Sequence, residues 1–234
     1  YGGNMRGKKI LFVVEQGLGD TLQMVRFAKV FADQGAYVGI EAQPALLSLL
    51  KTAPGVSQTL KPGDPIDGFD AWVPLMSIPS TLKIDLNAIP NDVPYLSAPT
   101  TQERINIPGG GLRVGIAWQG NPKHENDRYR SIRLHHWGPL FNVSGVNLVS
   151  LQVDRSLLAN EDTHLFKNIY DVTPLLTNFG ATAAVIESLD LVVTVDTSVA
   201  HLAGALGKPT WLLISPANDW RWMTERDDSP WYPT

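Results

Sequence analysis

Residues 191–213, LVVTVDTSVAHLAGALGKPTWLL, predict a strand, a turn, a helix and a second strand in succession. The first part is rich in β-branched valines, which is typical of a strand buried on both faces. Asp196 lies in the turn, and Thr197 or Ser198 can cap the helix that follows. Apolar residues recur in this helix at helical spacing, and Gly207 marks its end. A second buried strand is expected to complete the unit.

A helix that begins at the carboxyl end of a parallel strand directs backbone N–H groups and a partial positive charge towards a crevice. Phosphates bind at such places in α/β sheets. A similar unit stands near the start of the chain, in residues 8–35, KKILFVVEQGLGDTLQMVRFAKVFADQG. The sequence therefore predicts two helix starts of the same kind.

Size and composition restrict the class of protein. A chain of 234 residues, 44% of them hydrophobic, predicts one large domain or two domains of about 100–150 residues. The net charge of −4 argues against nucleic acid as a partner. The absence of cysteine excludes disulfides, thiolate catalysis and cysteine–zinc sites. With no apolar run of about 20 residues and no signal-peptide core, a soluble cytoplasmic protein without a membrane span is expected.

The first half of the chain alternates between strand and helix patterns. The predicted elements are a strand at 10–14, a glycine turn at 17–20, a helix at 21–34, a strand at 36–40, a helix at 44–51, and strands at 56–60 and 71–73. This alternation favours a parallel sheet with helices on both faces. Residues 1–98 are therefore predicted to form a Rossmann-like domain.

A polar, proline- and glycine-containing stretch follows, and residues 99–111 are predicted to be an interdomain linker. Residues 112–234 form the second predicted domain, with strands at 114–118 and 147–151 and helices at 136–141 and 179–188 before the opening unit. The predicted fold is α/β, with two doubly wound Rossmann-like domains that face each other across a cleft. The carboxyl ends of both sheets are expected to line this cleft.

Four ordered motifs carry a resemblance to a known family. They are EQGLGDTLQ (15–23), GIAWQGNPKHENDRYRSI (115–132), TAAVIESLDLVVTVDTSVAHLAGALGKPTWLL (182–213) and DWRWMTERDDSPWYPT (219–234). Together they resemble family 9-like glycosyltransferase domains. These domains are similar to the heptosyltransferases that build lipopolysaccharide cores and, more distantly, to O-linked N-acetylglucosamine transferases.

The resemblance implies a two-domain glycosyltransferase fold of the B type, a nucleotide-diphosphate sugar as donor, inversion at the anomeric carbon, and neither metal nor other cofactor. It implies a glycan, a lipid-linked glycan or a protein as acceptor. In bacterial proteins such domains often follow tetratricopeptide repeats, and this chain contains no such repeat. Family members usually continue into a closing segment that packs on the first domain, so a chain that stops at Thr234 is expected to close less completely.

Asp20 is the candidate catalytic residue. It lies at the start of the first predicted helix, after Gly17 and Gly19. These two glycines are candidate donor- or phosphate-binding residues, and their lack of a side chain also lets an acceptor approach the backbone. One interpretation is a helix N-cap. The other is a general base that takes the proton of the acceptor hydroxyl. The matching aspartate is the proposed base in the heptosyltransferases.

The turn and helix start of the opening unit are the predicted donor site. Backbone amides after Asp196, together with the hydroxyls of Thr197 and Ser198, are candidates to hold the diphosphate. Asp196 itself would repel phosphate, so a ribose hydroxyl or a backbone amide is its expected partner. His201 can neutralise the leaving diphosphate if it is protonated, and otherwise it is a core histidine.

The loop 120–132 is expected to supply charge to the donor site. Asn121, Lys123, Arg130 and Ser131 are its candidate phosphate ligands, with Arg128 less favoured, because transfer without a metal must offset the charge that develops on the diphosphate. The alternative is a solvated loop of mixed charge. No strict Asp-x-Asp pair and no histidine spacing suited to a metal occurs.

Three further residues are candidate nucleoside contacts. Gln152 follows a strand end, with a turn role as its alternative, and Thr182 either caps its helix or contacts ribose or phosphate. Trp220 can stack on a sugar or a base, or belong to the core. Nearby, Asp154 is expected at the cleft rim, and Arg221 can pair with phosphate.

These observations predict an inverting, metal-independent glycosyltransferase. Two alternatives stay open. A nucleotide-sugar epimerase of the same architecture would need no acceptor, and a non-catalytic nucleotide-sugar-binding module would bind the donor without turnover.

Overall fold

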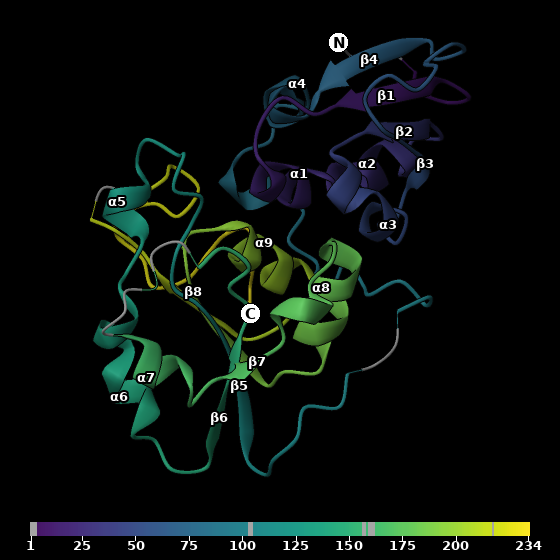
Figure 1. Cartoon of the computed structure of the whole chain (residues 1–234). Helices are drawn as coiled ribbons and strands as arrows, with labels where there is room; N and C mark the ends of the chain where they lie inside the picture. Colours follow the sequence, from purple (N-terminus) through teal and green to yellow (C-terminus); the bar gives the residue numbers. More distant parts are fainter. Residues whose placement is uncertain (1–3, 103–104, 156–157, 159–161, 217) are drawn as a thin grey trace.

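The computed structural model describes residues 4–102, 105–155, 158, 162–216 and 218–234. Two separate parallel sheets form its framework, one of four strands in the order β3-β2-β1-β4 and one of five in the order β7-β6-β5-β8-β9 (Figure 1). The first sheet uses strands from residues 9–74, and the second uses strands from residues 112–213. The predicted α/β architecture with two doubly wound units is therefore confirmed.

The first sheet follows the predicted order of strands and helices. Its strands are β1 (Lys9–Val13), β2 (Tyr37–Glu41), β3 (Val56–Leu60) and β4 (Ala71–Pro74), and its helices are α1 (Leu18–Met24), α2 (Phe27–Asp33), α3 (Leu47–Leu50) and α4 (Ile78–Thr81), with short 3₁₀ segments at Pro44–Leu46, Leu75–Ser77 and Leu86–Ala88. Buried apolar side chains from α1 and α2 pack against the central strands β1 and β2. These strands therefore place the turn before α1 at the carboxyl edge of the sheet.

One predicted helix, 21–34, is in fact two. The chain bends between α1 and α2, where Arg26 is buried and its Nε donates a 2.8 Å hydrogen bond to the carbonyl of Gln23. A side chain that takes a helix carbonyl competes with the backbone N–H that would otherwise bind it. The hydrophobic periodicity of the sequence did not predict this break, because the apolar spacing continues from α1 into α2.

The second sheet has the strand order of a Rossmann fold, with its first strand in the centre. Its strands are β5 (Leu112–Ala117), β6 (Val146–Ser150), β7 (Tyr170–Asp171), β8 (Leu191–Val195) and β9 (Thr210–Leu213), and its helices are α5 (Asp127–Arg130), α6 (Gly138–Phe141), α7 (Thr163–Phe166), α8 (Phe179–Glu187) and α9 (Ser198–Ala205), with 3₁₀ segments at Leu134–Trp137 and Thr173–Leu175. One face packs against α6 and α7, and the other packs against α8 and α9.

The opening unit folds as predicted in its first strand and its helix. The valines of β8 are at most 3% exposed, and the hydroxyl of Thr197 caps α9 by accepting the N–H of Val199 at 3.3 Å. Gly207 ends the helix with a φ of +68°. The second strand departs from the prediction, because β9 is an edge strand with Trp211 62% exposed and Leu213 38% exposed. In the described chain, no strand pairs with its outer edge.

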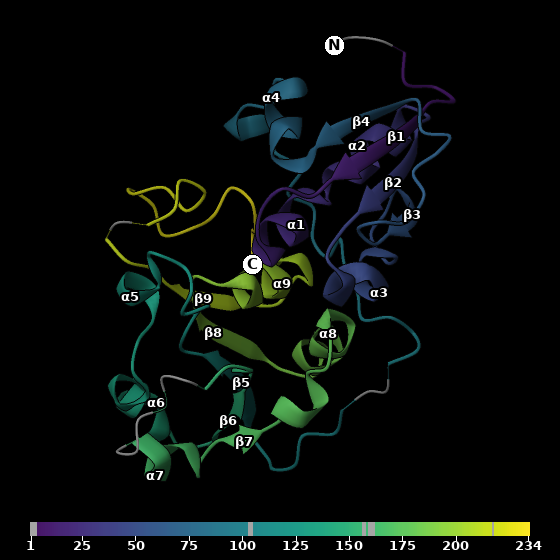
Figure 2. The ribbon, with the colours of Figure 1, turned by 45° about the horizontal axis from the view of Figure 1, so that its top comes forward.

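The two halves pack directly through α1 and α9, which lie against each other in both views (Figures 1 and 2). Gly19 makes this approach possible, because a Cβ at this position would come within 2.6 Å of the His201 ring. Residues 219–232 return to the first half, where Arg26 donates to the carbonyl of Trp231 at 2.6 Å. The predicted division into 1–98, 99–111 and 112–234 stays a prediction. Tyr95 and Leu96, just before the predicted linker, donate backbone hydrogen bonds to Ala205 in α9, so the two halves are also joined there.

None of the helices in the described part of the chain has the length and apolar character needed to cross a membrane.

Candidate functional site

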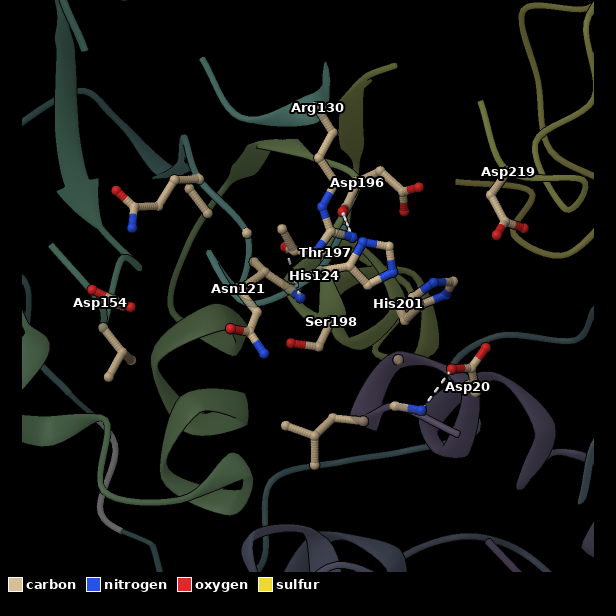
Figure 3. Close-up of a pocket in the computed structure, with 18 of the residues that line it drawn as sticks. Asp20, Asn121, His124, Arg130, Asp154, Asp196, Thr197, Ser198, His201 and Asp219 are labelled. Atoms are coloured by element: carbon tan, nitrogen blue, oxygen red, sulfur yellow. Dashed lines mark hydrogen bonds between the residues drawn. The ribbon is translucent and has the colours of Figure 1, made fainter. Parts of the chain in front are cut away.

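A cavity of about 1190 Å³ opens between the two sheets, at the carboxyl ends of their strands (Figure 3). The first half contributes mainly residues 16–20, which form the turn into α1. The second half contributes the turn after β5, the end of β6, the starts of α8 and α9, and residues 214–215 and 218–221 after β9. Gly17, Gly19 and Asp20 therefore share one cavity with Asp196, Thr197 and Ser198, as the two predicted helix starts required.

The start of α9 forms the floor of this cavity. Asp196 ends the turn, and its carbonyl accepts a 2.9 Å hydrogen bond from Nη1 of Arg130. Burial raises the pKa of the Asp196 carboxyl, and the positive charges of Arg130 and Arg221 offset part of that rise. Beside it, Thr197 and Ser198 line the cavity, and the Thr197 hydroxyl accepts the N–H of Val199 (Figure 3). An anion placed here meets helix amides and one guanidinium.

His201 is buried among aromatic side chains, as its alternative interpretation as a core histidine describes. It is 3% exposed, its Nδ1 lies 2.9 Å from the hydroxyl of Tyr232, and its ring stacks on Trp222 at a centroid distance of 5.2 Å. Burial and the nearby charges of Arg221 and Arg26 lower its pKa well below 6.5. His201 therefore holds α9 against α1 and the C-terminal residues without adding positive charge.

The loop after β5 is built around the buried carboxylate of Asp127. This group accepts hydrogen bonds from Arg130 Nε at 3.0 Å and from the Ser131 hydroxyl at 2.8 Å. Ser131 in turn accepts the N–H of Gly120 at 2.9 Å. Gly120 has no room for a side chain, because a Cβ would lie 2.3 Å from Asp127. Ser131 thus holds the two ends of the loop together through its hydrogen bonds with Gly120 and Asp127, and it does not line the cavity.

Arg130 and Asn121 line the cavity, but two other predicted cations do not. Lys123 is exposed, and Arg128 lies over the ring of Tyr129 at 4.5 Å, so in the described chain neither side chain reaches the cavity. The carboxamide oxygen of Asn121 accepts the N–H of Lys123 at 3.0 Å, which turns the loop. Spacing alone did not separate the three cations, because the short helix α5 directs neighbouring side chains to different sides.

Asp20 has both carboxylate oxygens engaged. One accepts the N–H of Gly17 at 2.9 Å, so Gly17 is the N-cap and Asp20 lies in the first turn of α1. The other accepts a 2.5 Å hydrogen bond from Nη2 of Arg221. Arg221 also binds Asp219 at 3.0 Å and Gln23 at 2.9 Å. The expected pairing of Arg221 with phosphate is therefore replaced by an ion pair that joins the C-terminal residues to α1.

Two of the candidate nucleoside contacts use their polar atoms within the protein. The carboxamide of Gln152 accepts the N–H groups of Trp118 and Gln119 at 3.1 and 3.0 Å and donates to the Gln119 carbonyl at 3.2 Å. This is the turn role that was its alternative. Thr182 does not cap α8, because Asn178 does so by accepting the N–H of Ala181 at 3.1 Å. The Thr182 hydroxyl donates to the Asn178 carbonyl at 3.0 Å.

The candidate nucleoside contacts also lie apart. Figure 3 shows Asp154, which follows Gln152, and Asp219, which precedes Trp220, on opposite sides of the cavity. Their strands β6 and β9 are separated by β5 and β8 in the sheet, so the strand ends lie about 14 Å apart at the usual strand spacing. Gln152 therefore lies at the β6 side of the cavity, and Asp219 lies at the opposite side.

Several cavity residues escaped the sequence reasoning. They include His124, Asn126 and Tyr129 of the loop after β5, and Asn178 and Phe179 at the start of α8. The position of Asn178 before an apolar helix was a usable signal, because asparagine is a preferred N-cap. His124 and Tyr129 lie inside the quoted motif 115–132, but nothing in their spacing indicates which way they point.

Comparison with known proteins gives one match to a family and several to solved structures. Residues 154–225 match glycosyltransferase family 9 (heptosyltransferase). The whole chain is 24% identical to Protein FlbA of Caulobacter vibrioides, over 263 aligned positions. It spans 43% of the length of that relative.

The fold is similar to a glycosyltransferase family 9 protein from Veillonella parvula, with a TM-score of 0.61, 10% identity, and coverage of 92% of this chain and 83% of that one. It is also similar to Escherichia coli heptosyltransferase WaaC with ADP, with a TM-score of 0.56, 15% identity, and coverage of 92% and 94%. The expected B-type fold and family resemblance are thus confirmed. The chain is similar to glycosyltransferase family 9 in the sequence of residues 154–225, and its fold is similar to that of a solved member of this family.

Proposed function

We propose that this chain transfers a sugar from a nucleotide-diphosphate donor to an acceptor hydroxyl, with inversion at the anomeric carbon and without a metal. The observation that carries the proposal is the shared cavity, into which α1 of one half and α9 of the other open their N-terminal ends. Group transfer needs two substrates held together in a fixed orientation. In a cleft between two Rossmann-like units, one unit can bind the donor and the other can bind the acceptor.

The donor belongs on the side of the second sheet. Its diphosphate is assigned to the amides at the start of α9, beside Thr197, Ser198 and Arg130. In Rossmann folds an acidic residue at the end of the second strand binds the ribose. Asp154 follows β6, the second strand of this sheet, and lines the cavity. This geometry favours a nucleoside at the β6 end and a sugar that points towards α1.

The acceptor hydroxyl is assigned to Asp20. In an inverting displacement the hydroxyl oxygen attacks the anomeric carbon opposite the departing diphosphate, and a base on the acceptor side takes its proton. The proton passes to the Asp20 carboxylate as the new bond forms and the bond to the diphosphate breaks. The leaving diphosphate gains negative charge, which Arg130 and the α9 amides offset. The ion pair with Arg221 fixes the orientation of the Asp20 carboxylate.

One observation favours a second function. Both Asp20 oxygens already accept hydrogen bonds, so an acceptor hydroxyl has to compete for them with the N–H of Gly17 and the guanidinium of Arg221. A nucleotide-sugar-binding module without turnover would tolerate this arrangement. The two functions share the donor site and differ at Asp20.

The test begins with ligand binding. The structural neighbour named with ADP makes ADP the first probe, followed by UDP and GDP and by their sugar conjugates, with the melting temperature as the readout. A bound donor is then incubated alone and with glycan acceptors, in the presence and absence of EDTA. Formation of a product with the opposite anomeric configuration supports the proposal. An epimerised donor without acceptor supports an epimerase, and donor binding without any product supports the binding module.

A further inference from the structure

Trp220 is an exposed indole in a cavity wall. It is 58% exposed and lines the cavity, whereas Trp222 and Trp231 in the same C-terminal segment are buried. Its ring forms a T-shaped pair with Trp231, at a centroid distance of 5.9 Å and an angle of 81°, and the Arg221 guanidinium lies 5.0 Å from its centre. The ring is therefore supported from the protein side and offers apolar surface to the cavity.

The Trp220 ring lies near Asp20, the candidate base for the acceptor, and away from Asp154, the candidate contact of the nucleoside. The same Arg221 guanidinium that contacts the Trp220 ring donates to the Asp20 carboxylate. A molecule stacked on Trp220 is thus a near neighbour of the candidate base. Asp154, the candidate ribose contact, lies on the opposite side of the cavity from Asp219 (Figure 3).

The charge at this end of the cavity indicates what can bind there. Asp20 and Asp219 share the single guanidinium of Arg221, and Asp196 lies close enough for its carboxyl to interact with Asp219. Two carboxylates with one cation leave negative charge, which disfavours a phosphorylated or carboxylated ligand. The face of an indole, in contrast, attracts the weakly positive C–H groups of a sugar ring.

We propose that Trp220 is the platform on which an uncharged sugar ring of the acceptor stacks, with its reacting hydroxyl directed to Asp20. This inference rests on the proposed function, because it needs a donor on the other side of the cavity. It specifies the acceptor as a neutral carbohydrate at the subsite next to the reaction.

The experiment measures sugar binding to the full chain saturated with ADP. Saturation-transfer NMR compares two neutral probes, methyl α-D-mannopyranoside and methyl β-D-glucopyranoside, with mannose 6-phosphate. The variants are Trp220→Ala, Trp220→Phe and the control Trp211→Ala, whose indole is 62% exposed on β9 and does not line the cavity. In parallel, the shift in melting temperature produced by ADP is measured for every variant.

We expect ring-proton signals from at least one neutral sugar, no stronger signal from the phosphate, and about a five- to tenfold loss of affinity in Trp220→Ala. Trp220→Phe and Trp211→Ala should retain binding. Undiminished sugar binding in Trp220→Ala, stronger binding of mannose 6-phosphate, or no sugar signal at all overturns the proposal. Weaker ADP binding in Trp220→Ala also overturns it, because the ring then stacks on the base. Failure of ADP to stabilise the wild-type chain would instead count against the donor site.

Discussion

The N-terminal ends of α1 and α9 both face the cavity and have the same helix dipole, but different groups of the protein lie at each end. At α1 the protein supplies its own anion, because Asp20 accepts the N–H of Gly17 and is paired with Arg221. At α9 the cap is the neutral hydroxyl of Thr197, with the guanidinium of Arg130 beside it. The helix start at α1 therefore already holds a carboxylate of the protein, whereas the cap at α9 is uncharged. The comparison teaches that a similar strand–turn–helix unit carries a carboxylate in one half and, under the proposed function, receives the diphosphate in the other.

The sharpest test of this comparison changes the anion at α1. Asp20→Asn should lower transfer by about 10²–10⁴-fold, the usual contribution of a positioned acid or base, because the amide cannot take the proton. Binding of the nucleoside diphosphate should stay close to the wild-type value. Asp33→Asn, on the exposed face of α2, is the matched control. Undiminished turnover in Asp20→Asn would remove Asp20 as the base.

The next change weakens the anion site at α9. Arg130→Ala should raise the dissociation constant for a nucleoside diphosphate by about 10–100-fold, as expected for the loss of a hydrogen bond to a charged group. Arg128→Ala, two residues away, removes a side chain that does not line the cavity and should leave the constant unchanged. Calorimetry distinguishes the two. Equal effects in both variants would mean that the loop attracts anions only through its overall charge.

A third prediction concerns the histidine that holds the two helices together. The pKa of His201 is lowered in the folded chain, so the unfolded chain takes up the proton first as the pH falls below about 6.5. The free energy of unfolding should therefore decrease by up to about 1.4 kcal/mol per pH unit below that value, until the folded-state pKa is reached.

Urea unfolding at pH 7.5, 6.5 and 5.5 measures this dependence. In His201→Asn the decrease over this range should be smaller, while His164→Asn, an exposed control, should behave like the wild type. An identical pH dependence in His201→Asn would show that other groups cause it.

The smallest expected effect separates the two capping residues considered for α9. Thr197→Ala should lower the free energy of unfolding by about 1 kcal/mol, because the N–H of Val199 loses its acceptor. Ser198→Ala, one position into the helix, should change it by no more than about 0.5 kcal/mol. Thermal or urea unfolding measures both. A larger loss in Ser198→Ala would contradict the capping geometry.

Short-range sequence patterns predicted most of the strands and helices, because the interactions that form these elements act between near neighbours in the chain. A run of β-branched residues, a capping threonine and a glycine after a helix act over a few residues, so β8, α9 and Gly207 follow from the sequence itself. The same holds for Asp20 and Thr197, which lie at helix starts that local signals define. The bend at Arg26 and the exposed edge strand β9 were missed, because both depend on what packs beside them.

The sequence by itself determined the two Rossmann-like units and the positions of their helix starts, since hydrophobic periodicity and capping need only near neighbours along the chain. The tertiary structure decided which side chains act together. It buried His201, placed Arg130 at the cavity while Lys123 and Arg128 stay outside it, and brought Arg221 from the far end of the chain to Asp20. Burial and ion pairing depend on distance in space, and residues 201 positions apart in the chain carry no local signal of their contact.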